Sequence, residues 1–202
     1  MSASPSLPQD HDLSAIAARI TRPVVLVGLM GVGKSTVGRK LANLLQRDFI
    51  DADDAIVEAA RRSIPEIFDT FGEAYFRDGE RRVIARLMDE AHGVIATGGG
   101  AFVDPSTRAI ILERGIAVWI DCDTDTLVER TARRGNRPLL KNGNPREILT
   151  RLAKERAPFY AQAHVRVVSE NGPHTATART IIEGINQWLL FPSRWPDAVT
   201  MS

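Results

Sequence analysis

The chain has 202 residues, of which 44% are hydrophobic and 25% charged, as is typical of one folded domain with a sizeable core. Its 26 basic residues nearly balance its 25 acidic residues, so the net charge of +1 gives no electrostatic reason to expect nucleic acid as the main partner. No apolar run is long enough to cross a bilayer, and the single cysteine, Cys122, excludes an internal disulfide framework and indicates a cytoplasmic protein.

The chain is expected to consist of one domain with a short segment at each end. Residues 1–20 are predicted to be a flexible N-terminal extension, with a short helix over 13–20 as the alternative, and they lack the pattern of a secretory signal. A single domain spans residues 21–190, and residues 191–202 form a tail. No long apolar face stands out as exposed, which favours a monomer.

From residue 23 onward, short apolar runs typical of buried strands alternate with segments of helical periodicity. This alternation predicts an α/β fold with three layers, α/β/α, around a five-stranded parallel sheet. Ligands of such sheets bind beyond the carboxyl ends of the strands, so the functional residues are expected there. The strands are predicted over 24–27, 49–51, 94–96, 116–120 and 165–168. The helices are predicted over 34–46, 53–61, 64–70, 73–91, 105–113, 124–133, 145–162 and 175–189.

Residues 28–35 follow the first strand and have the pattern G-x-x-x-x-G-K-S of a phosphate-binding loop. Its glycines let the backbone turn its N–H groups inward at a helix N-terminus, where they bind an anion. Lys34 reaches the β- and γ-phosphates, and the Ser35 hydroxyl ligates Mg²⁺. The alternative is an ordinary glycine-rich turn. The residues predicted here to contact ATP are Gly31, Val32, Gly33, Lys34, Ser35 and Thr36.

Two carboxylates follow the second strand. Strand alternation directs Asp51 and Asp53 to the same side, where one faces the Mg²⁺ at Ser35 and the other accepts a proton from an acceptor hydroxyl. The alternative is that Asp53 or Asp54 only caps the following helix.

Three consecutive glycines, Gly98, Gly99 and Gly100, follow the third strand. They allow a ligand to approach the backbone closely, whereas a plain flexible turn would not require three glycines.

A basic segment at residues 130–143 is interrupted by glycine and proline, which is typical of a mobile lid over phosphates; the alternative is an exposed basic loop. Two other arginines, Arg77 and Arg156, are by themselves interpreted as surface charges.

Together these motifs resemble the shikimate kinases, a family of nucleoside-monophosphate-kinase-like P-loop enzymes. The resemblance covers residues 24–189. It implies the P-loop kinase fold with a mobile lid, and transfer of the γ-phosphoryl group of ATP to the 3-hydroxyl of shikimate with Mg²⁺. The motifs are residues 28–35, Asp51-Ala52-Asp53, Phe76-Arg77-Asp78-x-Glu80, Ala96-Thr97-Gly98-Gly99-Gly100, Arg137-Pro138-Leu139-Leu140 and Arg156-Ala157-Pro158-x-Tyr160.

The resemblance also implies roles on the acceptor side. Asp53 is the base beside the shikimate hydroxyl, while Arg77 and Arg156 hold the substrate carboxylate, which suits a planar guanidinium. Residues 98–100 line the substrate pocket, and Glu80 orients the substrate arginine.

On the nucleotide side, the resemblance implies that Ser35 and Asp51 belong to the magnesium shell. Arg137 is the lid arginine that reaches phosphate and substrate and, with Lys34, stabilises the charge of the transferring group. Arg130 stacks on adenine, and the loop of residues 169–173, including Pro173, forms the opposite wall.

Two other functions stay open. One is another small-molecule kinase of the same fold, of the gluconate or nucleoside-monophosphate type, although two arginines favour a carboxylate acceptor over a base. The other is a catalytically silent nucleotide-binding module, against which the intact Lys34, Ser35, Asp51 and Asp53 argue.

Overall fold

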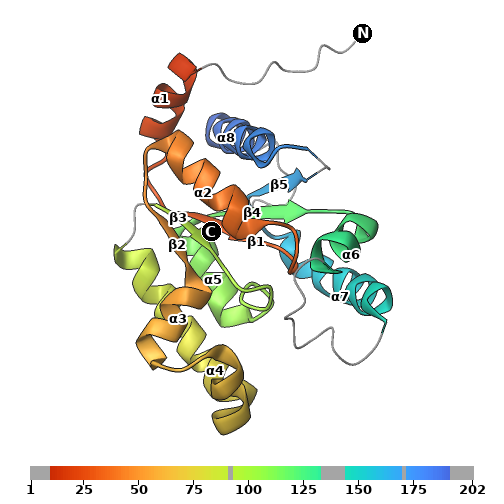
Figure 1. Ribbon diagram of the computed structural model, residues 1–202. Helices are drawn as coiled ribbons and strands as arrows, with labels where there is room; N and C mark the ends of the chain where they lie inside the picture. Colours follow the sequence, from red (N-terminus) through yellow and green to blue (C-terminus); the bar gives the residue numbers. More distant parts are fainter. Residues whose placement is uncertain (1–9, 91–92, 133–143, 170–171, 192–202) are drawn as a thin grey trace.

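The computed structural model describes residues 10–90, 93–132, 144–169 and 172–191. Its sheet has the strand order β2-β3-β1-β4-β5, and every pairing in it is parallel (Figure 1). The predicted five-stranded parallel sheet is therefore confirmed. The strands are β1 (Val24–Val27), β2 (Phe49–Asp51), β3 (Val94–Ala96), β4 (Ile116–Asp121) and β5 (Val165–Val168).

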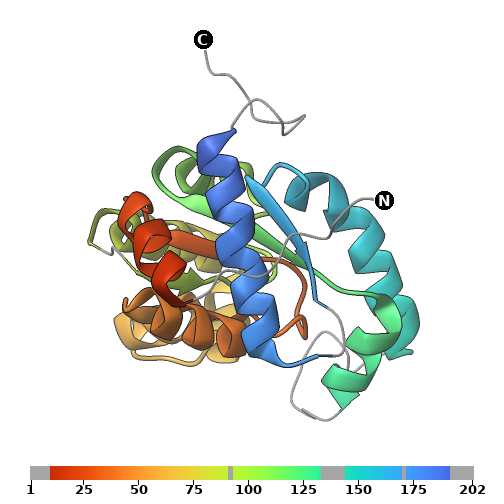
Figure 2. The ribbon, with the colours of Figure 1, turned by 90° about the horizontal axis from the view of Figure 1, so that it is seen from above.

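Helices cover both faces of the sheet, as the three-layer prediction requires. One face carries α1, α2 and α8, which contact one another, and α4 and α5 pack together on the other face (Figures 1 and 2). In the described part of the chain, no helix is both long and apolar enough to span a membrane. The helices are α1 (Asp10–Arg19), α2 (Lys34–Leu45), α3 (Ala52–Ala60), α4 (Ile64–Glu90), α5 (Pro105–Arg114), α6 (Thr124–Ala132), α7 (Pro145–Tyr160) and α8 (His174–Leu190).

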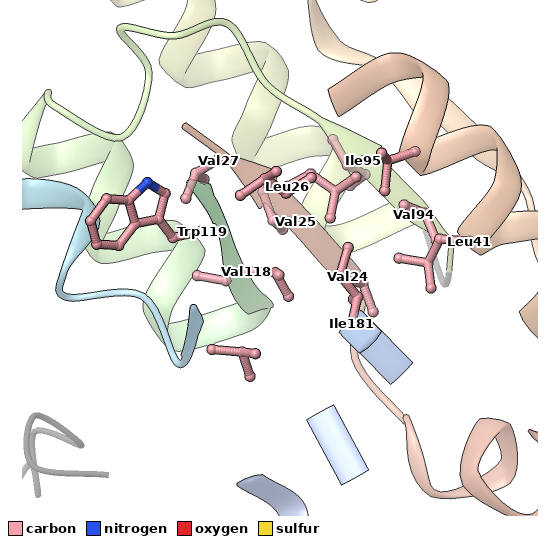
Figure 3. Packing of buried hydrophobic residues seen from close by; sticks show 14 of the residues in the cluster. Val24, Val25, Leu26, Val27, Leu41, Val94, Ile95, Val118, Trp119 and Ile181 are labelled. Carbon is pink, nitrogen blue, oxygen red and sulfur yellow. The ribbon is translucent and has the colours of Figure 1, made fainter. Parts of the chain in front are cut away.

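The central strand β1 is apolar throughout because helices cover it on both sides. All four of its residues are buried, and Leu41 of α2 and Ile181 of α8 lie in the same core cluster (Figure 3). Burying a side chain of this size contributes roughly 1.5–3 kcal/mol, so the core holds β1 and the segment that follows it in a fixed position.

The predicted flexible extension over residues 1–20 is wrong for residues 10–20. Residues 10–19 form α1, and Leu13, Ile16 and Ile20 are buried in the main core. These apolar residues recur at helical spacing, so α1 has one apolar face that packs on α2 and α8. Helix α1 thus begins three residues before the short helix that was the alternative. Residues 1–9 and the predicted tail over 192–202 lie outside the described residues.

The helices predicted over 64–70 and 73–91 are found as the single helix α4 with a kink at Gly72. This glycine has φ 80° and ψ 175°, a combination outside the helical region that favours glycine. The helix starts with a capping box, in which the Ser63 N–H donates to the Glu66 carboxylate at 2.8 Å. The break therefore lies at the predicted place, and Ile84, Leu87 and Met88 of the second half of α4 are buried in the main core.

The carboxyl ends of β1, β2 and β3 lie next to one another at one edge of the sheet. Asp51 at the end of β2 is level with Ala96 at the end of β3. The next residue, Thr97, is buried, and both its N–H and its hydroxyl donate to the Leu26 carbonyl of β1, at 3.2 and 3.1 Å. The loops that follow these strands therefore start from fixed points.

At the opposite end of the sheet, a histidine side chain extends the pairing of β4 with β5. The Ala117 N–H donates to Nδ1 of His164 at 2.9 Å, which requires a neutral imidazole. Its ring lies 4.7 Å from the Trp188 ring, and Arg22 lies over that tryptophan. Burial, with a smaller effect of the Arg22 charge, lowers the pKa of His164 to about 4.

This lowered pKa predicts that the protein loses stability in mild acid. The histidine pKa is about 4 in the folded chain and 6.5 in the unfolded chain, so the unfolded state binds the extra proton first as the pH falls. The neutral His164 therefore gives its full contribution to the free energy of unfolding above pH 6.5. This contribution is lost as the pH falls towards 4. The free energy of unfolding, measured with denaturant at pH 7.5 and at pH 4.5, should differ between these pH values by about 2 kcal/mol less in His164→Gln than in wild type. An identical pH dependence in both proteins would contradict this.

Candidate active site

The loop between β1 and α2 has the geometry of an anion-binding turn. Gly28, Gly31 and Gly33 have φ values of 134°, 88° and 95°, and a Cβ on Gly28 would clash with the Ile120 carbonyl oxygen of β4. Helix α2 starts directly after the loop, so its N-terminal N–H groups point to the same side. The Lys34 ammonium lies over the loop and donates to the Gly28 carbonyl at 2.8 Å. The loop therefore combines backbone donors with a cation.

Beside this loop, a hydroxyl and a carboxylate from two elements meet. The Ser35 hydroxyl donates to Oδ2 of Asp51 at 2.7 Å, and Oδ1 of Asp51 accepts the Asp53 N–H at 3.1 Å. Asp51 is thus the N-cap of α3, so the alternative in which Asp53 or Asp54 is the cap is wrong. The described residues contain no group of three metal-binding side chains. A hydroxyl and one carboxylate nevertheless fit Mg²⁺, which is usually bound by one or two carboxylates together with substrate phosphates.

The three-glycine turn after β3 brings together acidic and basic groups from three helices. A Cβ on Gly98 would lie 2.9 Å from Oδ1 of Asp53. One on Gly99 would lie 3.5 Å from Nη1 of Arg156, and one on Gly100 would lie 2.6 Å from Nη2 of Arg77. A side chain at Gly98 or Gly100 would therefore displace the Asp53 carboxylate or the Arg77 guanidinium, whereas a Cβ at Gly99 would only be in ordinary contact with Arg156.

The same turn lies against the phosphate-binding loop. A Cβ on Gly99 would be 3.4 Å from the Met30 nitrogen and 3.6 Å from the Gly28 oxygen. The phosphate-binding loop and the turn that Asp53, Arg77 and Arg156 contact therefore form one continuous site at the carboxyl ends of the strands.

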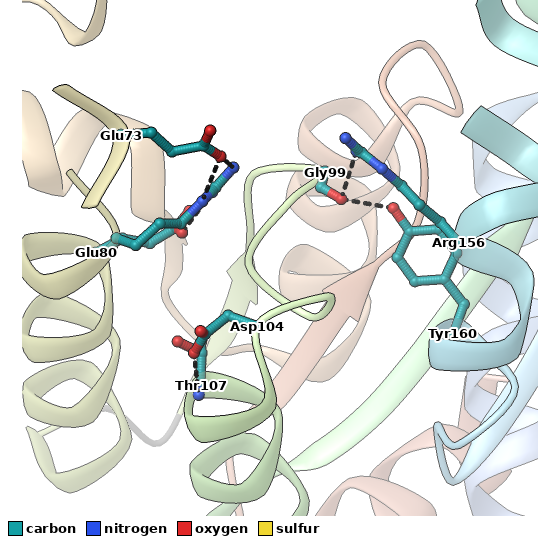
Figure 4. A network of polar contacts seen from close by, with 8 residues as sticks. Glu73, Glu80, Gly99, Asp104, Thr107, Arg156 and Tyr160 are labelled. Carbon is teal, nitrogen blue, oxygen red and sulfur yellow. Dashed lines mark hydrogen bonds and ion pairs between the residues drawn. The ribbon is translucent and has the colours of Figure 1, made fainter. Parts of the chain in front are cut away.

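Arg77 is fully paired with acidic side chains of its own helix. It donates to Oε2 of Glu80 at 2.8 Å and to Oε1 of Glu73 at 3.1 Å (Figure 4). Burial raises the pKa of the Glu80 carboxyl, the Arg77 charge opposes this shift, and the charges of Asp53 and Asp104 add to it. Burial alone would lower the pKa of Arg77, but the two glutamates raise it. The Arg77 charge is therefore largely compensated.

Arg156 has a different electrostatic environment. Its Nη1 donates to the Gly99 carbonyl at 3.0 Å, and no acidic side chain among the described residues forms an ion pair with it. Within the described ranges, no carboxylate thus cancels the positive charge of Arg156, and the guanidinium is suited to a bound anion.

The residues predicted to contact the base lie on the far side of the phosphate-binding loop. Arg130 of α6 donates to the Val32 carbonyl at 3.3 Å and to the Ser169 hydroxyl at 3.4 Å, and its guanidinium also contacts Cys122. Pro173 is the N-cap residue of α8.

Thr36 lines a pocket beside Ser35 together with Arg39, Lys40 and Asn43. Arg137 and the rest of the predicted lid, residues 133–143, lie outside the described residues.

Two residues of the site have contacts that the sequence reasoning did not assign. Glu73 is the second partner of Arg77, and the Tyr160 hydroxyl donates to the Gly99 carbonyl at 2.6 Å. In both cases the signal is a spacing of four residues on a helix, Glu73 to Arg77 and Arg156 to Tyr160, which places the two side chains on one face.

Comparison with known families decides which enzymes use such a site. The model of the shikimate kinase family matches residues 30–186 of the chain. The chain belongs to the shikimate kinase family. Members of this family transfer phosphate from ATP to shikimate, and the expected α/β P-loop kinase fold is confirmed by the solved structures described next.

Several individual members of the family are similar over most of their length. The shikimate kinase of Novosphingobium aromaticivorans is 62% identical over 91% of this chain and 97% of its own length. That of Caulobacter vibrioides is 51% identical over 87% of this chain and 86% of its own length. The solved shikimate kinase of Acinetobacter baumannii, in complex with shikimate, has a TM-score of 0.76 and 38% identity, and covers 88% of this chain and 98% of its own. A gluconokinase of Sinorhizobium meliloti, 19% identical with a TM-score of 0.54 over 87% of this chain and 99% of its own, shares the fold alone.

The ion pair between Arg77 and Glu80 predicts a specific pattern of stability. Arg77→Ala leaves a buried carboxylate without its cation, so unfolding in denaturant at pH 7.5 should show a loss of about 3 kcal/mol. The loss should become smaller as the pH falls, because the raised pKa of the Glu80 carboxyl favours its uncharged form in the folded state.

The second substitution Glu80→Gln should restore part of the stability, because no buried charge is then left unpaired. Arg82→Ala is the matched control, since Arg82 is on the same helix, paired with Asp78, and 69% exposed. An equal loss in the two arginine variants would contradict the buried-pair explanation.

Proposed function

We propose that this chain transfers the γ-phosphoryl group of ATP to the 3-hydroxyl of shikimate, giving shikimate 3-phosphate and ADP. The observation that carries the proposal is the contact between the three-glycine turn and the phosphate-binding loop, which brings an acceptor with a carboxylate next to a nucleotide phosphate. The relative from Acinetobacter baumannii, solved with shikimate, supports the choice of acceptor.

On the acceptor side, Asp53 is proposed to orient the acceptor hydroxyl and take its proton. Its carboxylate lies against Gly98, so a ring bound over the turn would present a hydroxyl to it. Arg156 and Arg77 are proposed to grip the substrate carboxylate, and residues 98–100 leave room for the ring. Binding at three points fixes the acceptor oxygen in line for attack, which is the main contribution that a loose phosphoryl-transfer transition state requires.

On the nucleotide side, the backbone N–H groups of residues 31–36 and the Lys34 ammonium are proposed to hold the β- and γ-phosphates. Ser35 and Asp51 are proposed to hold Mg²⁺, which when bound neutralises part of the phosphate charge. The 2.7 Å contact between these two side chains supports this proposal, because oxygens this close together can bind a single cation.

The walls of the nucleotide site complete the proposal. Arg130 is proposed to stack on the adenine, opposite Pro173 in the loop before α8. Its contacts with Val32 and Ser169 support this, since they tie the guanidinium to both flanking loops. Arg137 and the lid of residues 130–143 are proposed to close over the phosphates and exclude water, which otherwise would accept the phosphoryl group.

We further propose that the chain works as a monomer in the cytoplasm. Its single cysteine, Cys122, is buried and free, which fits a reducing compartment. Light scattering coupled to gel filtration would test the monomer, with a mass near 22.2 kDa expected and twice that mass as the contradicting result.

The function is tested by ADP release from ATP and Mg²⁺, with and without shikimate, and with gluconate and nucleoside monophosphates as competing acceptors. Release should depend on shikimate, and Asp53→Asn should lower kcat by about 10²–10⁴-fold. Asp54→Asn, an exposed carboxylate on the same helix, is the matched control and should keep wild-type turnover. Turnover with gluconate and not with shikimate would overturn the substrate, while ATP binding without any phosphorylated product would favour a silent module.

The charge of Arg156, which has no carboxylate partner among the described residues, predicts that this arginine contributes strongly to the affinity for shikimate. Arg156→Ala should raise the KM for shikimate by about 100-fold, since a charged pair with the substrate carboxylate contributes about 1.5–3 kcal/mol. The melting temperature should change little. Arg151→Ala removes an arginine of the same helix that is 68% exposed and should leave both values unchanged. Equal KM values in these two variants would contradict a role for Arg156 in binding the acceptor.

A further inference from the structure

Tyr160 is the last residue of α7, and its side chain is almost fully buried, with 2% exposed. Its hydroxyl donates to the Gly99 carbonyl at 2.6 Å, and Nη1 of Arg156 donates to the same oxygen at 3.0 Å (Figure 4). A carbonyl oxygen has two lone pairs and accepts both hydrogen bonds. The two donors are one helical turn apart, so a single face of α7 holds this oxygen.

The direction of this carbonyl fixes the direction of the neighbouring donor. A trans peptide is planar, so the Gly100 N–H points away from the Gly99 oxygen and hence away from α7. Figure 4 shows α4 and α7 on opposite sides of the turn. Within the described part of the chain, the N–H groups of residues 98–100 donate to no protein acceptor, whereas the Gly98 and Gly100 carbonyls accept turn hydrogen bonds. The orientation of this peptide thus decides what the turn presents to a ligand.

Glycine residues have no side chain to hold such a peptide, so its orientation depends on groups outside the turn. Tyr160 is well placed for this, because its ring packs against Trp119 of β4, 5.9 Å away between centroids, and Arg166 lies over that tryptophan. Burial raises the pKa of the Tyr160 hydroxyl, so it keeps its proton and remains a donor.

We propose that Tyr160 is a positioning residue for acceptor binding, which through the Gly99 carbonyl fixes both the peptide that faces the acceptor and the guanidinium of Arg156. This inference rests on the proposed function. Tyr160 itself does not touch the substrate, and its effect is confined to the acceptor half of the site, because the nucleotide half is built from other elements.

The test is Tyr160→Phe, which removes only the hydroxyl. The KM for shikimate, and the Kd measured by calorimetry without nucleotide, should rise about tenfold, as expected for one lost hydrogen bond that also loosens Arg156. The KM for ATP should stay within about twofold of wild type. The matched control is Tyr75→Phe, because the chain has two tyrosines and Tyr75 is 53% exposed. In this control, the KM and Kd for shikimate and the KM for ATP should all stay at their wild-type values.

A purely structural role would give a different pattern. In that case Tyr160→Phe would lower the melting temperature and leave the Kd for shikimate at its wild-type value, which overturns the inference. Trp119→Phe loosens the packing around the ring but keeps the hydroxyl, so it should lower the melting temperature without a tenfold loss of shikimate affinity. If Trp119→Phe lost as much shikimate affinity as Tyr160→Phe, the inference would also be overturned. Wild-type protein without shikimate-dependent turnover would refute the proposed function as well, whereas active wild type with an unchanged Tyr160→Phe variant refutes only the role of Tyr160.

Discussion

The close approach of two backbone segments, the phosphate-binding loop and the three-glycine turn, is the constraint on which the rest of the site depends. The two segments follow the neighbouring parallel strands β1 and β3. Directly before the turn begins, Thr97 after β3 donates two hydrogen bonds to the Leu26 carbonyl of β1. At Gly99 the turn is so close to Met30 that the two segments form one surface. A donor site and an acceptor site that share a wall in this way need no large movement of either to bring their ligands together.

This constraint explains why three helices direct their charged groups to one short turn. Glycine exposes its backbone to each of them, so α3, α4 and α7 can each place a polar group within contact distance. The arrangement concentrates two carboxylates and two guanidinium groups in a small volume. Within it, the buried carboxylate of Glu80 is paired with Arg77, which limits the cost of burying that charge.

The sequence was sufficient to predict the sheet, most helix positions and the residues at the strand ends, because each depends on local signals. Apolar runs mark buried strands, and the glycines of the phosphate-binding pattern mark a turn with positive φ values. The sequence was insufficient where the outcome depended on distant partners. Residues 10–20 were expected to be flexible, yet they bury three apolar side chains because α2 and α8 provide a surface for them. Likewise, the N-cap of α3 is Asp51 and not a later aspartate, since α3 begins at Ala52, one residue earlier than the helix predicted over 53–61.

The two arginines of the acceptor side illustrate what only the structure can add. From sequence, Arg77 and Arg156 are equivalent charges on two helices. In the structure, Arg77 is bound by two glutamates and Arg156 by a backbone carbonyl. A paired guanidinium has fixed geometry and little net charge, so it contributes shape and hydrogen-bond direction. A guanidinium held by a neutral carbonyl keeps its charge, so it contributes most of the attraction for an anion. The negative charge of Asp53 remains close to Arg77 and Glu80, and the pairing of those two groups therefore limits the repulsion between Asp53 and Glu80. The two arginines are thus expected to contribute differently to substrate affinity, although both contact the same turn.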